Sequence, residues 1–264
     1  MSLSKSKLSI RIVNGLLGLL LPLVLLVVWQ YATSHGMVNA VLIPPPKEIW
    51  EAFIDMVNSG ELWSNLLISG RRATLGFLLG GGLGLAAGLW VGFSLKAEKL
   101  FDPSIQLLRT LPHLAVAPLF ILWFGFGEAS KILLIAKAAF FPLYVNAFLG
   151  VRSVNNELFD VARVLQFSKL QTIFKLILPA SLPSIFLGAR LSIGVSWLAL
   201  IVAELMGSSS GIGYIINDAR SFSLTAVIFV GIIVFAVVGK LTDSIVKLAE
   251  FRLLRWQDHR KEVL

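Results

Sequence analysis

Residues 152–179 read RSVNNELFDVARVLQFSKLQTIFKLILP, a polar stretch that separates two long apolar runs. Two sets of apolar residues recur in it at i, i+3, i+4 and i+7, the spacing of one helix face: Leu158, Val161, Ala162 and Leu165, then Leu170, Ile173, Phe174 and Ile177. The pattern predicts two short amphipathic helices, with Pro179 and Pro183 ending the second. Held at a membrane surface, such a pair would form a rigid knob suited to docking a soluble partner.

Capping residues mark where the two predicted helices start. Asn155 or Asn156 can cap the first helix, because an Asn side chain accepts a hydrogen bond from an orphan backbone N–H. Ser168 followed by Gln171 matches a capping box at the start of the second helix. The connection between the helices is therefore predicted to be a tight turn beginning at Gln166.

The composition is that of a membrane protein. Of the 264 residues, 56% are hydrophobic and 14% are charged, against about 25% charged in an ordinary soluble domain. The net charge of +8 fits an excess of Lys and Arg in cytoplasmic loops better than nucleic-acid binding. The chain has no cysteine and its three histidines lie far apart, so we expect no metal site and no cofactor.

Six apolar runs are long enough to cross a hydrocarbon core about 30 Å thick. They are Ile12–Thr33, Ala73–Phe93, Ile105–Phe126, Ile132–Val151, Leu182–Met206 and Leu224–Val246. The first run is too long for a signal peptide and lacks a small-residue cleavage site after it, so it is predicted to be a retained span. Pro112 and Pro118 interrupt the third run. The sequence thus predicts an all-α, polytopic membrane protein.

The distribution of basic residues predicts the orientation. With both termini inside, the inner segments hold most of the basic tail after Lys240 and ten further cations: Lys5, Lys7, Arg11, Lys96, Lys99, Arg109, Arg152, Arg163, Lys169 and Lys175. The outer segments hold only Lys47, Arg71, Arg72, Lys131 and Arg220. Because cytoplasmic loops collect Lys and Arg, both termini and the polar knob are predicted to be cytoplasmic. In the first outer loop, three prolines at 44–46 are predicted to start a new helix.

The second apolar run carries glycines at strict four-residue spacing: Gly76, Gly80, Gly84, Gly88 and Gly92. Small residues at this spacing let two helix backbones approach closely in lipid. Helix packing is the expected role, and the same stripe could also line a path or a sliding contact.

The polar stretch resembles the cytoplasmic signature of permease subunits of bacterial ATP-driven (ABC) importers. That signature is Glu-Ala-Ala, three residues, Gly, nine residues and Ile-x-Leu-Pro; here it reads Asp160-Val161-Ala162, then Gln166, then Leu176-Ile177-Leu178-Pro179. Four other stretches resemble the aliphatic sulfonate permeases: Gly60–Trp63, Leu107–Ile132, Leu200–Met206 and Ser210–Tyr214. The likeness spans nearly the whole chain, and taurine, nitrate and pyrimidine-precursor permeases of the same branch look similar.

The resemblance implies the fold of a type I importer permease, with about six transmembrane helices in a single domain of residues 1–264. The first span is then 12–33, the permease core 66–251 and the coupling loop 152–179. It also implies a homodimer, two ATP-binding subunits docked on the coupling loops, and an extracytoplasmic binding protein that delivers a small organic anion such as an aliphatic sulfonate. The chain has no phosphate-binding loop of the form G-x-x-x-x-G-K-[ST], so we expect no ATPase activity of its own.

By the same resemblance, the helix Asp160–Leu165 lies in a groove of the ATPase, and coupling to the ATPase falls on eight residues: Asp160, Val161, Ala162, Arg163, Leu165, Gln166, Leu178 and Pro179. Read without the resemblance, Asp160 is a solvated helix charge that pairs with Arg163. Gln166 replaces the turn glycine of the signature. Glycine enters positive φ without steric cost, so we expect a turn that is reshaped or slightly strained.

Five polar residues fall within or beside the predicted spans. Either Arg71 or Arg72 could attract an anion at the outer mouth, the alternative being a headgroup anchor or a contact to the acidic first loop. Lys137 either snorkels to the outer headgroups or lines the substrate path. Glu204 snorkels poorly, so it should have a partner or a water-filled cavity, as a gate or a structural ion pair. His113 is expected to be a satisfied interior histidine and not a ligand.

Two other classes of function compete with an importer permease. A secondary transporter driven by an ion gradient would show inverted repeats and acidic residues at the midplane; no repeat is evident between the halves, and such residues are scarce. A membrane enzyme would need a catalytic constellation, and the runs contain no paired carboxylates, histidine cluster or nucleophile motif.

Overall fold

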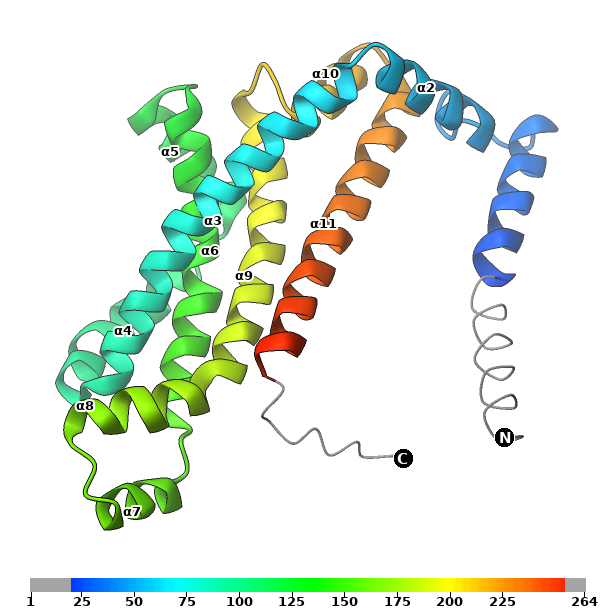
Figure 1. Ribbon diagram of the computed structural model, residues 1–264. Helices are drawn as coiled ribbons and strands as arrows, with labels where there is room; N and C mark the ends of the chain where they lie inside the picture. Colours follow the sequence, from blue (N-terminus) through cyan, green and yellow to red (C-terminus); the bar gives the residue numbers. More distant parts are fainter. Residues whose placement is uncertain (1–19, 255–264) are drawn as a thin grey trace, which may run out of the picture. The chain divides into compact units, whose positions relative to one another are not determined.

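The computed structural model describes residues 20–254, and every regular element within them is a helix (Figure 1). A helix at Leu20–Ser34 is followed by α2 (Pro46–Asn58), α3 (Glu61–Phe93), α4 (Leu95–Arg109), α5 (His113–Phe124), α6 (Glu128–Arg152), α7 (Asn156–Val164), α8 (Lys169–Thr172), the π-helical turn η1 (Ile173–Ile177), α9 (Leu178–Gly207), α10 (Ile212–Ser221) and α11 (Thr225–Leu253).

Four helical stretches in the described part of the chain are long and apolar enough to cross a membrane: Glu61–Phe93, Glu128–Arg152, Lys169–Gly207 and Thr225–Leu253. Helices α4 and α5 make a fifth if the bent pair is counted as one span. The predicted first span, 12–33, lies partly outside the described residues, and only its second half is seen as the apolar helix Leu20–Ser34. The protein is therefore all-helical and polytopic, with four or five spans in its described part.

The third predicted span, Ile105–Phe126, is broken, as its interrupting prolines indicate, and the break lies at Pro112 and not at Pro118. Helices α4 and α5 are bent by 98° relative to each other. Pro112 lies at the break, as the N-cap of α5 in an extended conformation. Proline has no N–H to donate and disfavours a helical conformation in the residue before it, so the helix stops ahead of Leu111. Pro118, in contrast, lies inside α5 and does not end it.

The prediction that Pro179 and Pro183 end the second knob helix is wrong. Helical structure continues from Lys169 to Gly207, with Pro179 in the first turn of α9 and Pro183 inside it. The last hydrogen bond of η1 runs from the Leu178 N–H to the carbonyl of Ile173. The turn is therefore already widened where the chain reaches the residue that has no N–H.

The described residues form two compact units, 20–63 with 215–233, and 64–214 with 234–254. In the first unit Pro46 is the first residue of α2, as the three prolines predict. The indole of Trp29 lies 5.5 Å from the ring of Phe229, and the Thr225 hydroxyl donates to the carbonyl of Val41 at 2.6 Å. These contacts fold the loop before α2 against the start of α11.

The core of the second unit is the pair α6 and α9, which run side by side in Figure 1. The Ser184 hydroxyl donates to the carbonyl of Asn146 at 2.8 Å, and the Ser192 hydroxyl donates to that of Ala139. Small polar residues of this kind let two helices approach in lipid while their hydroxyls stay hydrogen-bonded.

The glycine stripe packs α3 closely onto α6. A Cβ added at any of the five glycines would come within 2.9 Å of an α6 atom. At Gly80 the clash would be with the backbone of Ala136, which cannot rotate away. Gly82, on another face of the same helix, has no atom within 4 Å of its Cβ position. The stripe is therefore a helix-packing surface, which is the expected role.

We expect Gly80→Val to lower stability by about 1–3 kcal/mol more than Gly82→Val, because only the first overpacks a backbone contact. The two variants share the same change in helix propensity and the same host helix, so the difference isolates the contact with α6. Thermal unfolding of the purified chain in detergent micelles measures it. Equal melting temperatures for the two variants would contradict this account of the packing.

Candidate functional site

The polar stretch forms a two-helix knob, residues 153–177, after the end of α6 and before α9. At its start the Asn155 side chain accepts a hydrogen bond from the Glu157 N–H at 3.2 Å, so Asn155 is the cap and Asn156 is the first helical residue. The predicted capping box is present: the Ser168 N–H donates to the Gln171 side chain at 2.9 Å, and the Gln171 N–H donates to the Ser168 hydroxyl at 3.3 Å.

Helix α7 ends in a Schellman motif centred on Gln166. The Phe167 N–H donates to the carbonyl of Ala162 at 2.9 Å, and the Gln166 N–H donates to that of Arg163 at 3.0 Å. Gln166 adopts φ +53°, the left-handed conformation that glycine enters freely. The turn therefore keeps the shape that suits glycine, and Gln166 carries a strain of about 1 kcal/mol.

The knob presents apolar residues that the described part of the chain does not cover. Of the predicted apolar face of α7, only Ala162 is buried, whereas Leu158, Val161 and Leu165 are exposed. Val164 beside them is 83% exposed. Up to residue 168 the knob lies outside the candidate membrane spans. An exposed apolar patch in such a place is typical of an interaction surface.

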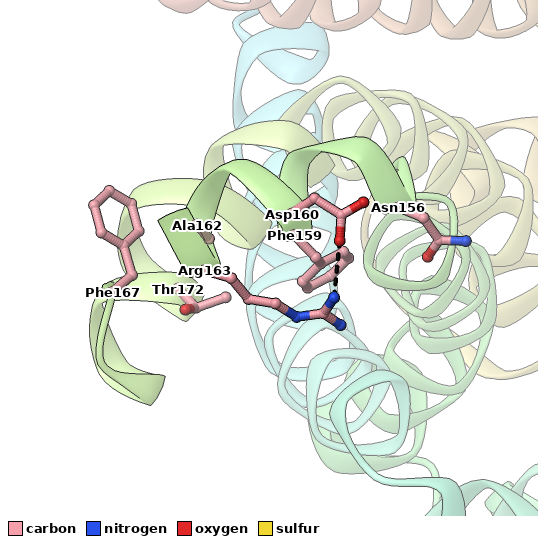
Figure 2. Close-up of a pocket in the computed structure, with 7 residues that line it drawn as sticks. All are labelled: Asn156, Phe159, Asp160, Ala162, Arg163, Phe167 and Thr172. Atoms are coloured by element: carbon pink, nitrogen blue, oxygen red, sulfur yellow. Dashed lines mark hydrogen bonds and ion pairs between the residues drawn. The ribbon is translucent and has the colours of Figure 1, made fainter. Parts of the chain in front are cut away.

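A hollow of about 340 Å³ lies against α7 (Figure 2) and is lined by Asn156, Phe159, Asp160, Ala162, Arg163, Phe167 and Thr172. At its rim Asp160 Oδ1 lies 2.8 Å from Arg163 Nη1, with the two side chains 68% and 79% exposed. This is the solvent-exposed pair with Arg163 that the sequence predicts for Asp160 when the resemblance is left aside. An exposed pair of this kind contributes little to stability, so both charges are available to a docking protein.

A second constellation, the arginine cluster, lies at the other end of α6 and α9. Arg72 of α3 is 2% exposed, yet all five of its N–H donors are engaged. Its Nε and Nη2 donate to both oxygens of Glu128, at 2.8 and 2.5 Å. Its Nη1 donates to Glu204 Oε1 at 2.8 Å and to the carbonyl of Ser210 at 2.7 Å, and Nη2 also reaches the Ser210 hydroxyl at 3.1 Å.

The carboxylate of Glu204 also accepts several hydrogen bonds within the arginine cluster. It is 1% exposed and accepts from the Ser69 hydroxyl at 2.8 Å and from the Gly213 N–H at 2.8 Å, in addition to Arg72. Gly211 adopts φ +105°, and a Cβ there would overlap the Glu204 carboxylate. The close approach of this loop to the carboxylate therefore requires glycine at that position.

The four predicted path residues do not converge on one site. Arg72 and Glu204 bind each other, and this gives Glu204 the partner that was expected for it. Arg72 has no free donor for an anion in this conformation, while the neighbouring Arg71 is exposed. The Lys137 Nζ donates to the carbonyl of Leu111 at 2.8 Å, at the break between α4 and α5.

Sequence reasoning missed three members of the arginine cluster, Ser69, Glu128 and Ser210. Glu128 carries the clearest signal, since it is a carboxylate that follows two glycines and opens an apolar run. Its pairing with an arginine 56 residues earlier depends on how α3 packs on α6. The expectation for His113 is also wrong, because its Nδ1 is buried and has no hydrogen-bond partner among residues 20–254.

We expect Arg72→Gln to lower stability by about 3–5 kcal/mol, because it leaves the buried carboxylate of Glu204 without a counter-charge. The matched control is Arg71→Gln on the same helix, where an exposed side chain should change stability by no more than about 0.5 kcal/mol. Unfolding of both variants in mixed micelles measures the difference. A loss at Arg72 no larger than at Arg71 would show that the cluster does not hold the unit together.

Proteins of similar sequence are named as transport permeases. The chain is 60% identical to a Bacillus subtilis (strain 168) protein named as an aliphatic sulfonates transport permease, SsuC, over 91% of this chain and 87% of the relative. It is 45% identical to the Escherichia coli (strain K12) protein of the same name, over 92% and 93%. It is 34% identical to the taurine transport system permease protein TauC of Escherichia coli (strain K12), over 88% and 86%.

A solved structure has a similar fold. A chain of the MetNI methionine ABC transporter, in an inward-facing conformation, superimposes with a TM-score of 0.54 at 16% identity, covering 74% of this chain and 93% of that one. Residues 80–255 match the family model described as a binding-protein-dependent transport system inner membrane component. That range includes the glycine stripe from Gly80 onward, the knob and α9. The chain therefore belongs to the family of binding-protein-dependent transport system inner membrane components, the permeases of ABC importers.

Proposed function

We propose that this chain is the permease of an ABC importer that carries aliphatic sulfonates into the cytoplasm. The proposed substrate rests on the 60% identity to SsuC of Bacillus subtilis, which extends over nine-tenths of the chain. The identity to the taurine permease is little more than half as high, so taurine, nitrate and pyrimidine precursors are less favoured. An ion-gradient transporter is set aside, because the family is one of binding-protein-dependent systems.

The knob is proposed to be the docking site of a separate ATP-binding subunit. Two features of the knob support this proposal: the exposed apolar face of α7, and the exposed charges of Asp160 and Arg163 beside the hollow. The coupling residues Val161, Ala162, Leu165 and Gln166 lie on this helix and its turn. Leu178 and Pro179 lie at the start of α9, so they would transmit the motion and not contact the ATPase.

A mechanical route connects the knob with the arginine cluster. From Lys169 to Glu204 the helical path is continuous and measures about 50 Å at 1.5 Å per residue. A force on the knob would reach the far end of α9, where Arg72 clamps Glu204 and the loop at Ser210 against α3 and α6. On this proposal two copies of the chain pair, with their knobs and termini cytoplasmic, and a binding protein docks at the opposite face.

Deletion of the gene should abolish growth on alkanesulfonates as the sole sulfur source and leave growth on sulfate unchanged. The same panel should include taurine, and nitrate should be offered as the nitrogen source. Uptake by proteoliposomes that hold the permease and its ATPase should require ATP and the binding protein. Growth on every sulfonate at the wild-type rate would refute the proposed substrate, and uptake without the ATPase would refute the importer.

Reversal of the charge at Asp160, by Asp160→Lys, should reduce copurification of the ATPase by at least about tenfold, which corresponds to 1.4 kcal/mol. On this proposal the Asp160 carboxylate faces a positively charged surface of the ATPase. A lysine at position 160 would be repelled by that surface. The permease should stay folded, because the Asp160–Arg163 pair is exposed and weak.

The matched control for Asp160→Lys is Asp218→Lys, which makes the same charge change at an exposed carboxylate of α10. It should leave copurification of the ATPase as in the wild type. Both variants are compared by pull-down after size-exclusion chromatography has shown that the permease is monodisperse. If the two variants retain equal amounts of ATPase, α7 is not the docking helix.

A further inference from the structure

Lys137 lies inside α6, one of the helices long and apolar enough to cross a membrane. It is nine residues past Glu128, the first residue of α6, which is about 13 Å along the helix. Helix α5 is 12 residues long, so the break before it is about 18 Å from the other end of α5. Both distances are shorter than a hydrocarbon core about 30 Å thick, so Lys137 and the break lie within the lengths of their candidate spans.

The charge of Lys137 is not compensated by the residues around it. Its Nζ donates to the carbonyl of Leu111, 2.8 Å away, and lies 5.9 Å from the centroid of the Phe141 ring. No carboxylate of the described residues lies within 4.0 Å of it, whereas Arg72 and Arg190, also in spans, each contact two carboxylates. A full charge in a candidate span that has no counter-charge among residues 20–254 is a candidate for a functional site.

The groups around the break have hydrogen-bonding capacity to spare. An ammonium group has three donors, and the Leu111 carbonyl accounts for one of those on Lys137. His113, the first residue of α5, has a buried Nδ1 without a partner among the described residues. The ring of Phe141 lies near the amine, and Leu114, next to His113 in the chain, is an exposed apolar residue of α5.

We propose that Lys137 binds the negatively charged headgroup of the substrate during its passage, at the break between α4 and α5. This rests on the proposed function and names the residue that recognises the charge within the membrane. A single ammonium in an apolar setting matches an alkanesulfonate, which has one fixed negative charge and an apolar tail. In passage the amine exchanges the Leu111 carbonyl for a sulfonate oxygen and then returns to it. One contact of this kind is weak enough for the substrate to leave again.

The first test uses uptake by the complete importer, reconstituted with its ATPase and binding protein. Lys137→Gln removes the charge and keeps an N–H donor on a side chain that is one bond shorter. We expect uptake of an alkanesulfonate to fall at least tenfold, with a KM within twofold of the wild type because the binding protein captures the substrate. ATP hydrolysis stimulated by the binding protein should stay within twofold, and Lys137→Arg should restore most of the uptake.

The control variant is Lys240→Gln in α11, where the lysine has a carboxylate, that of Asp243, at 3.9 Å. It should transport as the wild type does. If the wild type itself takes up no sulfonate, the proposed function fails. If the wild type transports and Lys137→Gln transports equally well, the role of Lys137 is refuted while the proposed function stands. A parallel loss of uptake, ATP hydrolysis and melting temperature would make Lys137 structural and also overturn the proposal.

A second test asks whether position 137 faces the substrate path. The chain has no cysteine, so Lys137→Cys gives the permease a single thiol and the wild type gives no background. We expect 2-sulfonatoethyl methanethiosulfonate, itself an alkanesulfonate, to label the permease in vesicles that hold the complete importer. An unlabelled thiol would mean that the position faces lipid or packed protein, and it would overturn the proposal.

Discussion

The full pairing of Arg72 is the constraint on which the packing of the second unit depends. A guanidinium has five N–H donors, and when it is buried each of them needs a hydrogen-bond acceptor from the protein. Here the acceptors come from three separate parts of the chain: Glu128 at the start of α6, Glu204 near the end of α9 and the loop at Ser210. Because each acceptor lies on a different element, the arginine fixes the relative positions of all three against α3.

The close packing of the helices agrees with the position of the arginine cluster. Helix α3 lies against α6 along the glycine stripe, where glycines such as Gly80 and Gly84 leave no Cβ in the contact. Between α6 and α9, small serines such as Ser192 donate a hydrogen bond across the contact. The knob, at the other end of this rigid group, is joined to it by continuous helix on the α9 side. A displacement of the knob must therefore be carried by the bundle as a body or released at the π-helical turn.

Sequence predicted best those features that depend on neighbouring residues. The capping box at Ser168 and the start of α2 at Pro46 were readable because both partners lie within one helical turn. Features that depend on packing were not readable. Pro112 ends a helix and Pro183 does not, although both are prolines in apolar runs. The pairing of Arg72 with Glu128 joins residues 56 apart, and single-sequence periodicity contains no information on which helices are neighbours.

The two cations Arg72 and Lys137 differ in their counter-charges. Arg72 is paired with carboxylates and holds helices together, whereas Lys137 has no carboxylate partner among the described residues and can bind an anion. Arg72 has five donors in a rigid fork, all held by protein acceptors, so binding an anion there would first require breaking a buried network. Lys137 has a flexible stem and one neutral carbonyl partner, so an arriving anion gains a full charge interaction and displaces only a dipole. In a membrane, where an uncompensated charge is costly, keeping such a lysine makes physical sense if the missing counter-charge arrives with the substrate. On this reasoning the same bundle uses an arginine to hold its helices together and a lysine to recognise what passes between them.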